Sequence, residues 1–302
     1  MEIFSEFNNN SNLSIALGYF DGVHIGHKKV IKTAVDYARD NNVKSAVITF
    51  KDHPCCYFWN VRPKYILTRE ERRKKISELG VDYLYELDFA QIAKYRADEY
   101  LKNVIIKYFS PVAISTGFNH NFGFNKSGNT AYLANMALKY NYKYFMTDAE
   151  RLNNVVISST EIRNLLSDGN IINANNMLGY SFFVSGIVVE GKQLGRTIGF
   201  RTANIVYPDE LIDIPYGVYA TLLYVDDKSY FAVTNYGIRP TISSDYSSVL
   251  ESHIIEFNED IYNKNIRVEF LYKIRNEIKF KSVDDLKVQI EKDISYVKSR
   301  IK

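Results

Sequence analysis

The chain has few cysteines, and those it has cannot close a loop. Cys55 and Cys56 are the only cysteines among 302 residues, and they are adjacent. A bridge between neighbours constrains no long segment of chain, so the sequence excludes a disulfide-stapled fold. Proteins without structural disulfides are typical of the reducing cytoplasm, which is the compartment that we expect.

Long hydrophobic runs are also missing. No segment approaches the roughly 18 uninterrupted apolar residues of a membrane-spanning helix. The opening stretch, MEIFSEFNNNSN, lacks the basic region and apolar core that mark a secretory signal. We therefore expect neither export nor a membrane partner.

Charge of either sign is in little excess. The 38 basic and 35 acidic residues leave a formal net charge of +3, whereas nucleic-acid-binding proteins usually concentrate far more positive charge. One basic run, REERRKK at 69–75, contains two glutamates, and we interpret it as a solvated helix face. With no RNA-recognition motif in the sequence, we expect no nucleic-acid partner. Nothing in the sequence indicates an oligomer.

Length and periodicity predict two domains of different class. A chain of 302 residues exceeds the size at which single cores usually stop growing. In residues 1–179 short apolar runs alternate with helical patterns, which is typical of a parallel sheet with crossover helices. In residues 180–302 several short strand-like runs precede a final amphipathic helix, which predicts a small barrel or sandwich. We expect an α/β domain followed by a β-barrel domain with a terminal helix.

Local patterns place the individual elements. Thr68 is a predicted helix cap, Gly80 a predicted left-handed helix end, and Ser282 the cap of the final helix. A further helix follows the first strand, and another covers 131–138. The pattern is helical again from 159 to 166, pauses at Asp168-Gly169 and resumes to 178. Strands are predicted at Leu13–Tyr19, Ser45–Phe50, Val81–Glu86, Pro111–Ser115, Phe182–Val189, Val218–Tyr224, Tyr230–Thr234, Val249–Phe257 and Ile266–Leu271.

The first strand runs into a segment suited to phosphate. GYFDGVHIGH, from Gly18 to His27, leads from a strand into a helix N-terminus, where backbone N–H groups favour anions. Gly22 and Gly26 let the backbone approach a triphosphate. His24 and His27 are three residues apart and can donate from one side to charge developing on an α-phosphate. A single such histidine is usually structural, but two separated by Ile-Gly after a strand match the H-x-G-H signature of nucleotidylyltransferases.

A second motif of the same superfamily lies near the end of the first domain. ISSTEIR, at 157–163, places Ser158, Ser159 and Thr160 at a helix start and Arg163 one turn later. Alone it is a helix cap. Together with the histidine motif it predicts the other wall of an ATP site.

The second domain contains a glycine-rich segment. GIVVEGKQLGRTIGFRTAN, at 186–204, resembles a phosphate loop followed by oxygen donors on Thr202 and Asn204. Glycine loops in β domains are often tight turns, so this segment is informative only with its surroundings.

All these segments together resemble one family. GYFDGVHIGH, TFKDHP, ISSTEIR, the glycine segment, VTNYGIRPT and LESHI resemble the bifunctional riboflavin kinase/FMN adenylyltransferase of bacteria along nearly the whole chain. The resemblance implies a Rossmann-like first domain that joins FMN and ATP to give FAD and pyrophosphate. It also implies a six-stranded barrel that phosphorylates riboflavin with ATP and Mg²⁺. The implied partners are riboflavin, FMN, FAD and ATP.

The resemblance also implies roles for individual residues. His24, His27, Arg163 and Glu251 would be catalytic, with Glu251 the base that accepts a ribityl proton. Thr202 and Asn204 would hold the metal. Flavin would contact Asn119, Phe122, Gly123 and Arg275. ATP would contact Gly18, Phe20, Asp21, Gly26, Ser158, Ser159, Thr160, Gly191, Gly195 and Gly199.

Several positions depart from the family pattern. Arg201 stands where the family has proline, which removes a φ restraint and adds a charge near phosphate. His120 and Asn121 replace an aromatic and arginine pair, and Asn129 and Asn263 replace other typical residues. Two alternatives stay open: an enzyme in which one site has decayed, and a flavin-binding regulatory or storage protein. The products formed from riboflavin and ATP would separate them.

Overall fold

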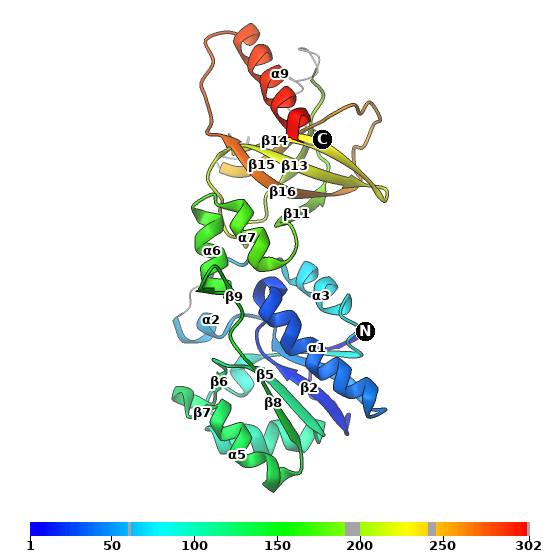
Figure 1. The fold of residues 1–302 in the computed structure, drawn as a ribbon, viewed down its shortest axis with the longest axis vertical. Helices are drawn as coiled ribbons and strands as arrows, with labels where there is room; N and C mark the ends of the chain where they lie inside the picture. The colour runs from blue at the N-terminus through cyan, green and yellow to red at the C-terminus, as the bar shows by residue number, and fades with distance from the viewer. Residues whose placement is uncertain (60–61, 191–199, 241–245, 301–302) are drawn as a thin grey trace. The chain divides into compact units, whose positions relative to one another are not determined.

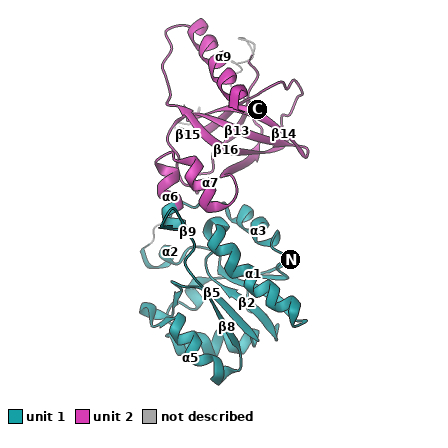
Figure 2. Ribbon diagram, viewed as in Figure 1, with its two compact units in different colours: residues 1–161 teal, residues 162–302 magenta. Residues whose placement is uncertain are grey.

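The computed structural model describes residues 1–59, 62–190, 200–240 and 246–300 (Figure 1). Its contacts divide the chain into two compact units, Met1–Glu161 and Ile162–Lys302 (Figure 2). The predicted boundary lies later, between residues 179 and 180. The contacts assign the helices that precede it to the second unit, since Asn175 donates a hydrogen bond to Phe270 O at 2.8 Å and accepts one from Phe182 N at 2.7 Å. The boundary at 179/180 stays a prediction.

The first unit is built on a parallel six-stranded sheet in the order β1-β4-β3-β2-β5-β8. Its strands are β1 (Glu2–Phe4), β2 (Leu13–Leu17), β3 (Lys44–Phe50), β4 (Tyr83–Leu87), β5 (Ala113–Gly117) and β8 (Lys143–Thr147), with small hairpins from β6 (Asn121–Phe122), β7 (Gly128–Asn129), β9 (Arg151–Leu152) and β10 (Val155–Val156). Its helices are η1 (Asp21–Val23), α1 (Ile25–Asp40), α2 (Pro54–Trp59), α3 (Arg69–Ser77), η2 (Phe89–Gln91), α4 (Ala97–Tyr100), η3 (Leu101–Phe109), η4 (Phe124–Lys126), α5 (Thr130–Tyr140) and the first turn of α6 (Ser159–Ser167).

The central strands of this sheet are buried, as a parallel sheet requires. All five residues of β2 are buried, and α1 packs its buried Val30, Ala34 and Ala38 against β2, β3 and β5 (Figure 1). The predicted helix spacing after the first strand is therefore confirmed. The edge strands β1 and β8 are short and partly exposed, so they lack the apolar runs that revealed the central strands.

Helix α3 differs from the sequence prediction. Thr68 caps it as expected, because its Oγ1 accepts a hydrogen bond from Glu71 N, and Gly80 has the predicted left-handed φ of 82°. The interpretation of its basic run as a solvated face is confirmed for Glu70 and Lys74, whose side chains are 76% and 51% exposed, but it is wrong for Arg72. Arg72 is only 3% exposed, because the fully buried carboxylate of Glu86 on β4 binds three arginines of this helix.

The second unit is a nearly closed antiparallel barrel in the order β11-β16-β13-β14-β15-β12. Its elements are the rest of α6, α7 (Ile171–Leu178), β11 (Phe183–Ile187), β12 (Ala203–Val206), β13 (Gly217–Val225), β14 (Lys228–Pro240), β15 (Tyr246–Ile254), β16 (Asn265–Arg275) and α9 (Val283–Arg300). The predicted strands and terminal helix are confirmed, with β14 and β16 longer than the sequence indicated. Inside the barrel the hydroxyls of Thr221, Thr234 and Ser252 form a buried hydrogen-bonded ladder. Helix α9 covers the outer face, where Val218 and Val233 pack with Val297.

Candidate functional sites

Two histidines stack in the turn between β2 and α1. The ring centroids of His24 and His27 are 3.6 Å apart with an interplanar angle of 20°. His24 caps α1, since its Nδ1 accepts a hydrogen bond from His27 N at 3.3 Å. A Cβ added at Gly26 would lie 3.3 Å from Cε1 of His24, so glycine leaves room for this ring. Because Nδ1 accepts, the neutral His24 ring carries its proton on Nε2 and can donate there.

Burial keeps both rings uncharged. It lowers the pKa of His24 to about 4, and it lowers the pKa of His27 well below the usual value, which a proton on His24 would lower further. The Nδ1 atom of His27 is buried and has no hydrogen-bond partner among the described residues. Near neutral pH the turn therefore presents neutral imidazoles, which can donate a hydrogen bond without becoming cations.

The second motif meets the first. Ser159 Oγ donates a hydrogen bond to Asp21 O at 2.9 Å, although the two residues are 138 positions apart. Ser158 Oγ accepts from Glu161 N and so caps α6, as predicted, while Thr160 on its first turn is exposed. Arg163 lies one turn further along α6, in the second compact unit.

Three other predicted ATP residues belong to the same turn. Phe20 and Asp21 are buried, and Asp21 Oδ1 accepts a hydrogen bond from Ile66 N at 3.0 Å, which joins the turn to the segment before α3. Gly18 lies where β2 ends and lines a large cavity. The predicted ATP residues Gly191, Gly195 and Gly199 lie outside the described residues.

That cavity occupies the carboxyl end of the parallel sheet. Its volume is about 610 Å³, and its wall is rich in aromatic rings. The predicted flavin residues Phe122 and Gly123 line it, whereas Asn119 lies in the loop before β6. The other lining side chains that matter here are Tyr19, His53, Cys55, Phe58, Trp59, Phe89, Tyr100, His120 and Asn121.

The sequence did not identify most of this wall. Helix α2 supplies Phe58 and Trp59, which stay 48% and 73% exposed and so present bare rings beside the cavity. The only signal for them was the cluster of aromatic residues after TFKDHP. Cys55 belongs to the same wall, and its Sγ lies 2.9 Å from His53 Nδ1.

Strand pairing in the barrel places two predicted residues, Asn204 and Glu251, in one row with Asn235. Asn204 of β12 is opposite Glu251 of β15, and Glu251 is opposite Asn235 of β14. Directly opposite residues of antiparallel strands point to the same face. Glu251 and Asn235 line a second cavity of about 500 Å³ between the barrel and α9. The sequence could not tell which way Glu251 points; the register shows that it faces this cavity.

Arg275 and His253 line the same cavity. Arg275 binds both carboxylate oxygens of the buried Asp293 on α9, at 3.0 and 2.8 Å to Oδ2 and 3.2 Å to Oδ1. His253 was not among the predicted site residues. Its Nδ1 donates a hydrogen bond to Arg201 O at 2.9 Å, and this bond fixes the backbone beside Thr202.

Asn204 has the chemistry of a metal ligand. Its Nδ2 lies 3.3 Å from Thr202 O, while its Oδ1 is buried and has no partner in the described part of the chain. A buried carbonyl oxygen without a partner is unfavourable unless a cation or donor binds it. Thr202 lines both the cavity of about 500 Å³ and a smaller one of about 130 Å³ that Asn204 also lines.

Comparisons with known proteins assign each part of the chain to a known family. Residues 6–161 match the family model described as FAD synthetase, and residues 178–301 match the model described as riboflavin kinase. The bifunctional riboflavin kinase/FMN adenylyltransferase of Haemophilus influenzae is 35% identical over 95% of this chain and 93% of its own length. That of Listeria monocytogenes is 32% identical over 93% of this chain and 90% of its own length. The chain belongs to the family of bifunctional riboflavin kinase/FMN adenylyltransferases.

One solved structure is similar to this chain along its full length. A chain from Streptococcus pneumoniae titled macrolide-efflux protein is 31% identical, covers 99% of both chains and gives a TM-score of 0.88. Among the described residues, no helix is long and apolar enough to cross a membrane.

The buried histidines make the first unit sensitive to acid. Burial lowers the pKa of both His24 and His120 to about 4, whereas an unfolded histidine titrates near 6.5. Between these values the unfolded chain binds protons that the folded chain does not, so stability is full above pH 6.5 and falls toward pH 4. We expect each ring to reduce the free energy of unfolding by about 2 kcal/mol between pH 7.5 and 5. Urea titrations followed by circular dichroism at the two pH values would measure this loss.

The variant His120→Gln isolates one ring from the carboxylates that titrate at lower pH. It should lose less stability than the natural chain over the same interval. An equal loss in both proteins would show that His120 does not titrate as its burial indicates.

Proposed function

We propose that the two units carry the two activities of this family in separate sites. The barrel phosphorylates riboflavin with ATP to give FMN. The α/β unit then adenylylates FMN with a second ATP to give FAD and pyrophosphate. The observation that supports this proposal is the pair of cavities, each bordered by the residues that its reaction needs.

We assign the flavin of the second reaction to the cavity of about 610 Å³. A pocket of this size suits a tricyclic ring system, and aromatic walls stack on flat rings. The ring of Phe122 packs against two other rings of this wall, with its centroid 5.7 Å from that of His120 and 5.6 Å from that of Tyr100. Phe122 and Gly123 would then contact the flavin, with Asn119 nearby.

The triphosphate belongs at the adjoining turn. Gly18 lines the flavin cavity and begins the turn that presents His24, His27 and the N-terminus of α1. Ser158, Ser159, Thr160 and Arg163 would complete the ATP site from α6. FMN brings an ionised phosphate as its own nucleophile, so this reaction needs no protein base. The turn has to position ATP and to stabilise charge on the α-phosphate and the leaving pyrophosphate.

The kinase reaction does need a base, and we assign it to Glu251. A ribityl hydroxyl has a proton that must be accepted as it attacks the γ-phosphate. Glu251 lines the cavity between the barrel and α9, where Arg275 would contact the flavin. Thr202 and Asn204 would hold Mg²⁺, which shields the phosphate oxygens when bound, and the buried Oδ1 of Asn204 supports this assignment.

We also propose a cytoplasmic protein without nucleic-acid or membrane partners. The two cysteines are adjacent in sequence and so close no loop, and the positive and negative charges are nearly balanced. Its partners would then be riboflavin, FMN, FAD and ATP.

Truncation of one ring tests the flavin cavity. We expect Phe122→Ala to raise the KM for FMN about 10-fold, because it removes stacking worth roughly 1 kcal/mol or more. The KM for ATP and the phosphorylation of riboflavin should not change. Steady-state FAD formation at varied FMN, followed by chromatography, would give these constants.

Phe124→Ala is the matched control, since Phe124 is two residues away and is 43% exposed. It should leave the KM for FMN unchanged. If Phe122→Ala behaved like this control, the flavin would have to bind elsewhere.

A further inference from the structure

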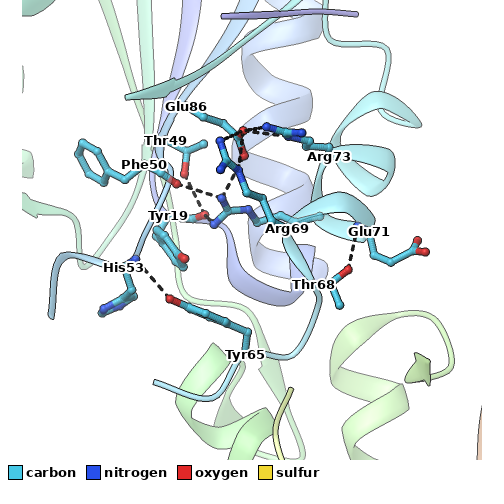
Figure 3. Close-up of polar contacts among 11 residues, drawn as sticks. Tyr19, Thr49, Phe50, His53, Tyr65, Thr68, Arg69, Glu71, Arg73 and Glu86 are labelled. Carbon is cyan, nitrogen blue, oxygen red and sulfur yellow. Dashed lines mark hydrogen bonds and ion pairs between the residues drawn. The ribbon is translucent and has the colours of Figure 1, made fainter. Parts of the chain in front are cut away.

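Three arginines converge on one buried carboxylate behind the first cavity. Glu86 has no exposed surface, and Arg69 and Arg73 of α3 bind it (Figure 3). Arg72 of the same helix binds it as well. Arg69 Nη2 and Arg73 Nε lie 2.7 and 2.8 Å from Oε2, and Arg72 Nη2 lies 3.3 Å from Oε1. One guanidinium would neutralise one carboxylate. Arg69 and Arg73 keep 39% and 33% of their side chains exposed, so water solvates part of their charge, whereas the Arg72 side chain is only 4% exposed. Burial therefore makes the placement of Arg72 the costly one.

Arg72 is the deepest of the three and reaches furthest toward the site. Its Nη1 donates to Tyr19 O at 3.2 Å, and its Nη2 donates to Phe50 O at 3.0 Å. Tyr19 follows β2 by two residues and Phe50 ends β3, so one guanidinium ties together the carboxyl ends of two neighbouring strands. Its Nε is buried without a partner in the described ranges, which adds to the unfavourable terms of this placement.

The same guanidinium also fixes an aromatic ring. The Cζ atom of Arg72 lies 4.5 Å from the centroid of the Tyr19 ring, within the range of a cation–π contact. Tyr19 in turn packs edge-on against His53, with centroids 4.8 Å apart at 82°. Both Tyr19 and His53 line the cavity of about 610 Å³. A continuous chain of contacts therefore runs from Glu86 through Arg72 and Tyr19 to the cavity wall.

Tyr19 is also part of the nucleotide turn, since it lies between Gly18 and Phe20 in GYFDGVHIGH. The hydroxyl of Thr49 donates a second hydrogen bond to Tyr19 O at 3.0 Å. The position of Tyr19 therefore affects both the flavin wall and the start of the triphosphate turn.

We propose that Arg72, held in place by Glu86, is a positioning residue for FMN adenylylation. It sets the Tyr19 ring and the end of β2, so that the flavin wall and the nucleotide turn keep a fixed relation. It touches no reacting atom. This role rests on the proposed flavin cavity, and it adds a residue on which the binding of FMN depends.

Arg72→Lys tests the role with the charge retained. A lysine ammonium cannot bond to Tyr19 O, Phe50 O and Glu86 together as the planar guanidinium does. We expect kcat/KM for FMN to fall about 10-fold or more, mainly through KM, because the wall is misplaced rather than removed. Riboflavin phosphorylation by the same molecules should stay normal, which gives an internal measure of folded protein.

Asp82→Asn is the matched control. Asp82 precedes β4 by one residue and accepts hydrogen bonds from Lys44 Nζ at 2.7 Å and Ser45 N at 2.9 Å, at the opposite end of the same strand pair. It should lower the melting temperature without changing the KM for FMN. If Arg72→Lys also lost only stability, the positioning role would be refuted.

If Arg72→Lys does not fold, a second variant can still test the positioning role of Arg72. Tyr19→Leu leaves the Glu86 cluster intact and removes the ring that Arg72 holds. It should raise the KM for FMN about as much as Arg72→Lys does, and an unchanged KM would overturn the proposal. If the flavin does not bind in the cavity of about 610 Å³ at all, a different result is expected, because Phe122→Ala would then also leave the KM for FMN unchanged.

Discussion

His27→Ala should stop the reaction sequence at FMN. The imidazole of His27 stacks on His24 at the N-terminus of α1, where its Nδ1 is buried and both rings are neutral. Removing one preorganised donor from such a site reduces kcat about 100- to 1,000-fold. With riboflavin, ATP and Mg²⁺ supplied, we expect FMN to accumulate and FAD to form at that reduced rate. Chromatographic separation of the two flavins over time would measure both rates in one reaction.

Thr33→Ala on the same helix is the control. Thr33 is partly exposed, and its Oγ1 donates to Lys29 O within α1, away from the histidine pair. This variant should make FAD at the natural rate. If His27→Ala formed FAD at the natural rate, His27 would not be a catalytic residue. The chain would still belong to the family.

The same assay separates the remaining alternatives. A protein that only stores flavin would form neither product, and an enzyme with a decayed kinase would convert supplied FMN but not riboflavin. The arrangement around Arg201 argues against decay of the barrel site. Its guanidinium donates to Asn258 O at 3.2 Å, and its carbonyl accepts from His253. Arg201, which stands where the family has proline, therefore makes hydrogen bonds that hold this segment in place.

Local chemistry explains what the sequence could predict. The two histidines and the serine motif are short segments whose spacing implies a turn and a helix start, and Ser159 does bond to Asp21. Five strands of the barrel were found because they are short strand-like runs separated by turn signals, whereas β12 was not predicted. The final helix was found because its apolar residues recur three and four apart.

Non-local pairing explains what the sequence could not predict. The run around Arg72 looked solvated because its counterion, Glu86, lies on a strand 14 residues away. Glu251 could be placed on a strand but not on a face, since the face depends on its pairing with Asn204 and Asn235. The aromatic wall combines α2, η2, α4 and β6, and no single segment shows that these meet.

Glu251→Gln should block the first reaction and spare the second. Glutamine keeps the size and hydrogen-bonding shape of glutamate but cannot accept a proton, so riboflavin phosphorylation should fall about 100- to 10,000-fold. Supplied FMN should still become FAD, because that reaction uses the other unit and needs no protein base. Product chromatography with riboflavin or FMN as the starting flavin would separate the two rates.

Two further variants test whether Glu251→Gln loses riboflavin phosphorylation because it lacks a general base. Glu256→Gln changes an exposed carboxylate just beyond β15 that is bonded to Lys298, and it should phosphorylate riboflavin normally. Asn204→Ala removes the buried oxygen assigned to Mg²⁺, so its activity should recover partly as Mg²⁺ is raised, whereas that of Glu251→Gln should not. Rescue of Glu251→Gln by Mg²⁺ would mean that this carboxylate acts as a metal ligand. Normal turnover by Glu251→Gln would instead require another base facing the cavity, and His253, two residues along the same strand and on the same face, would be the next group to replace.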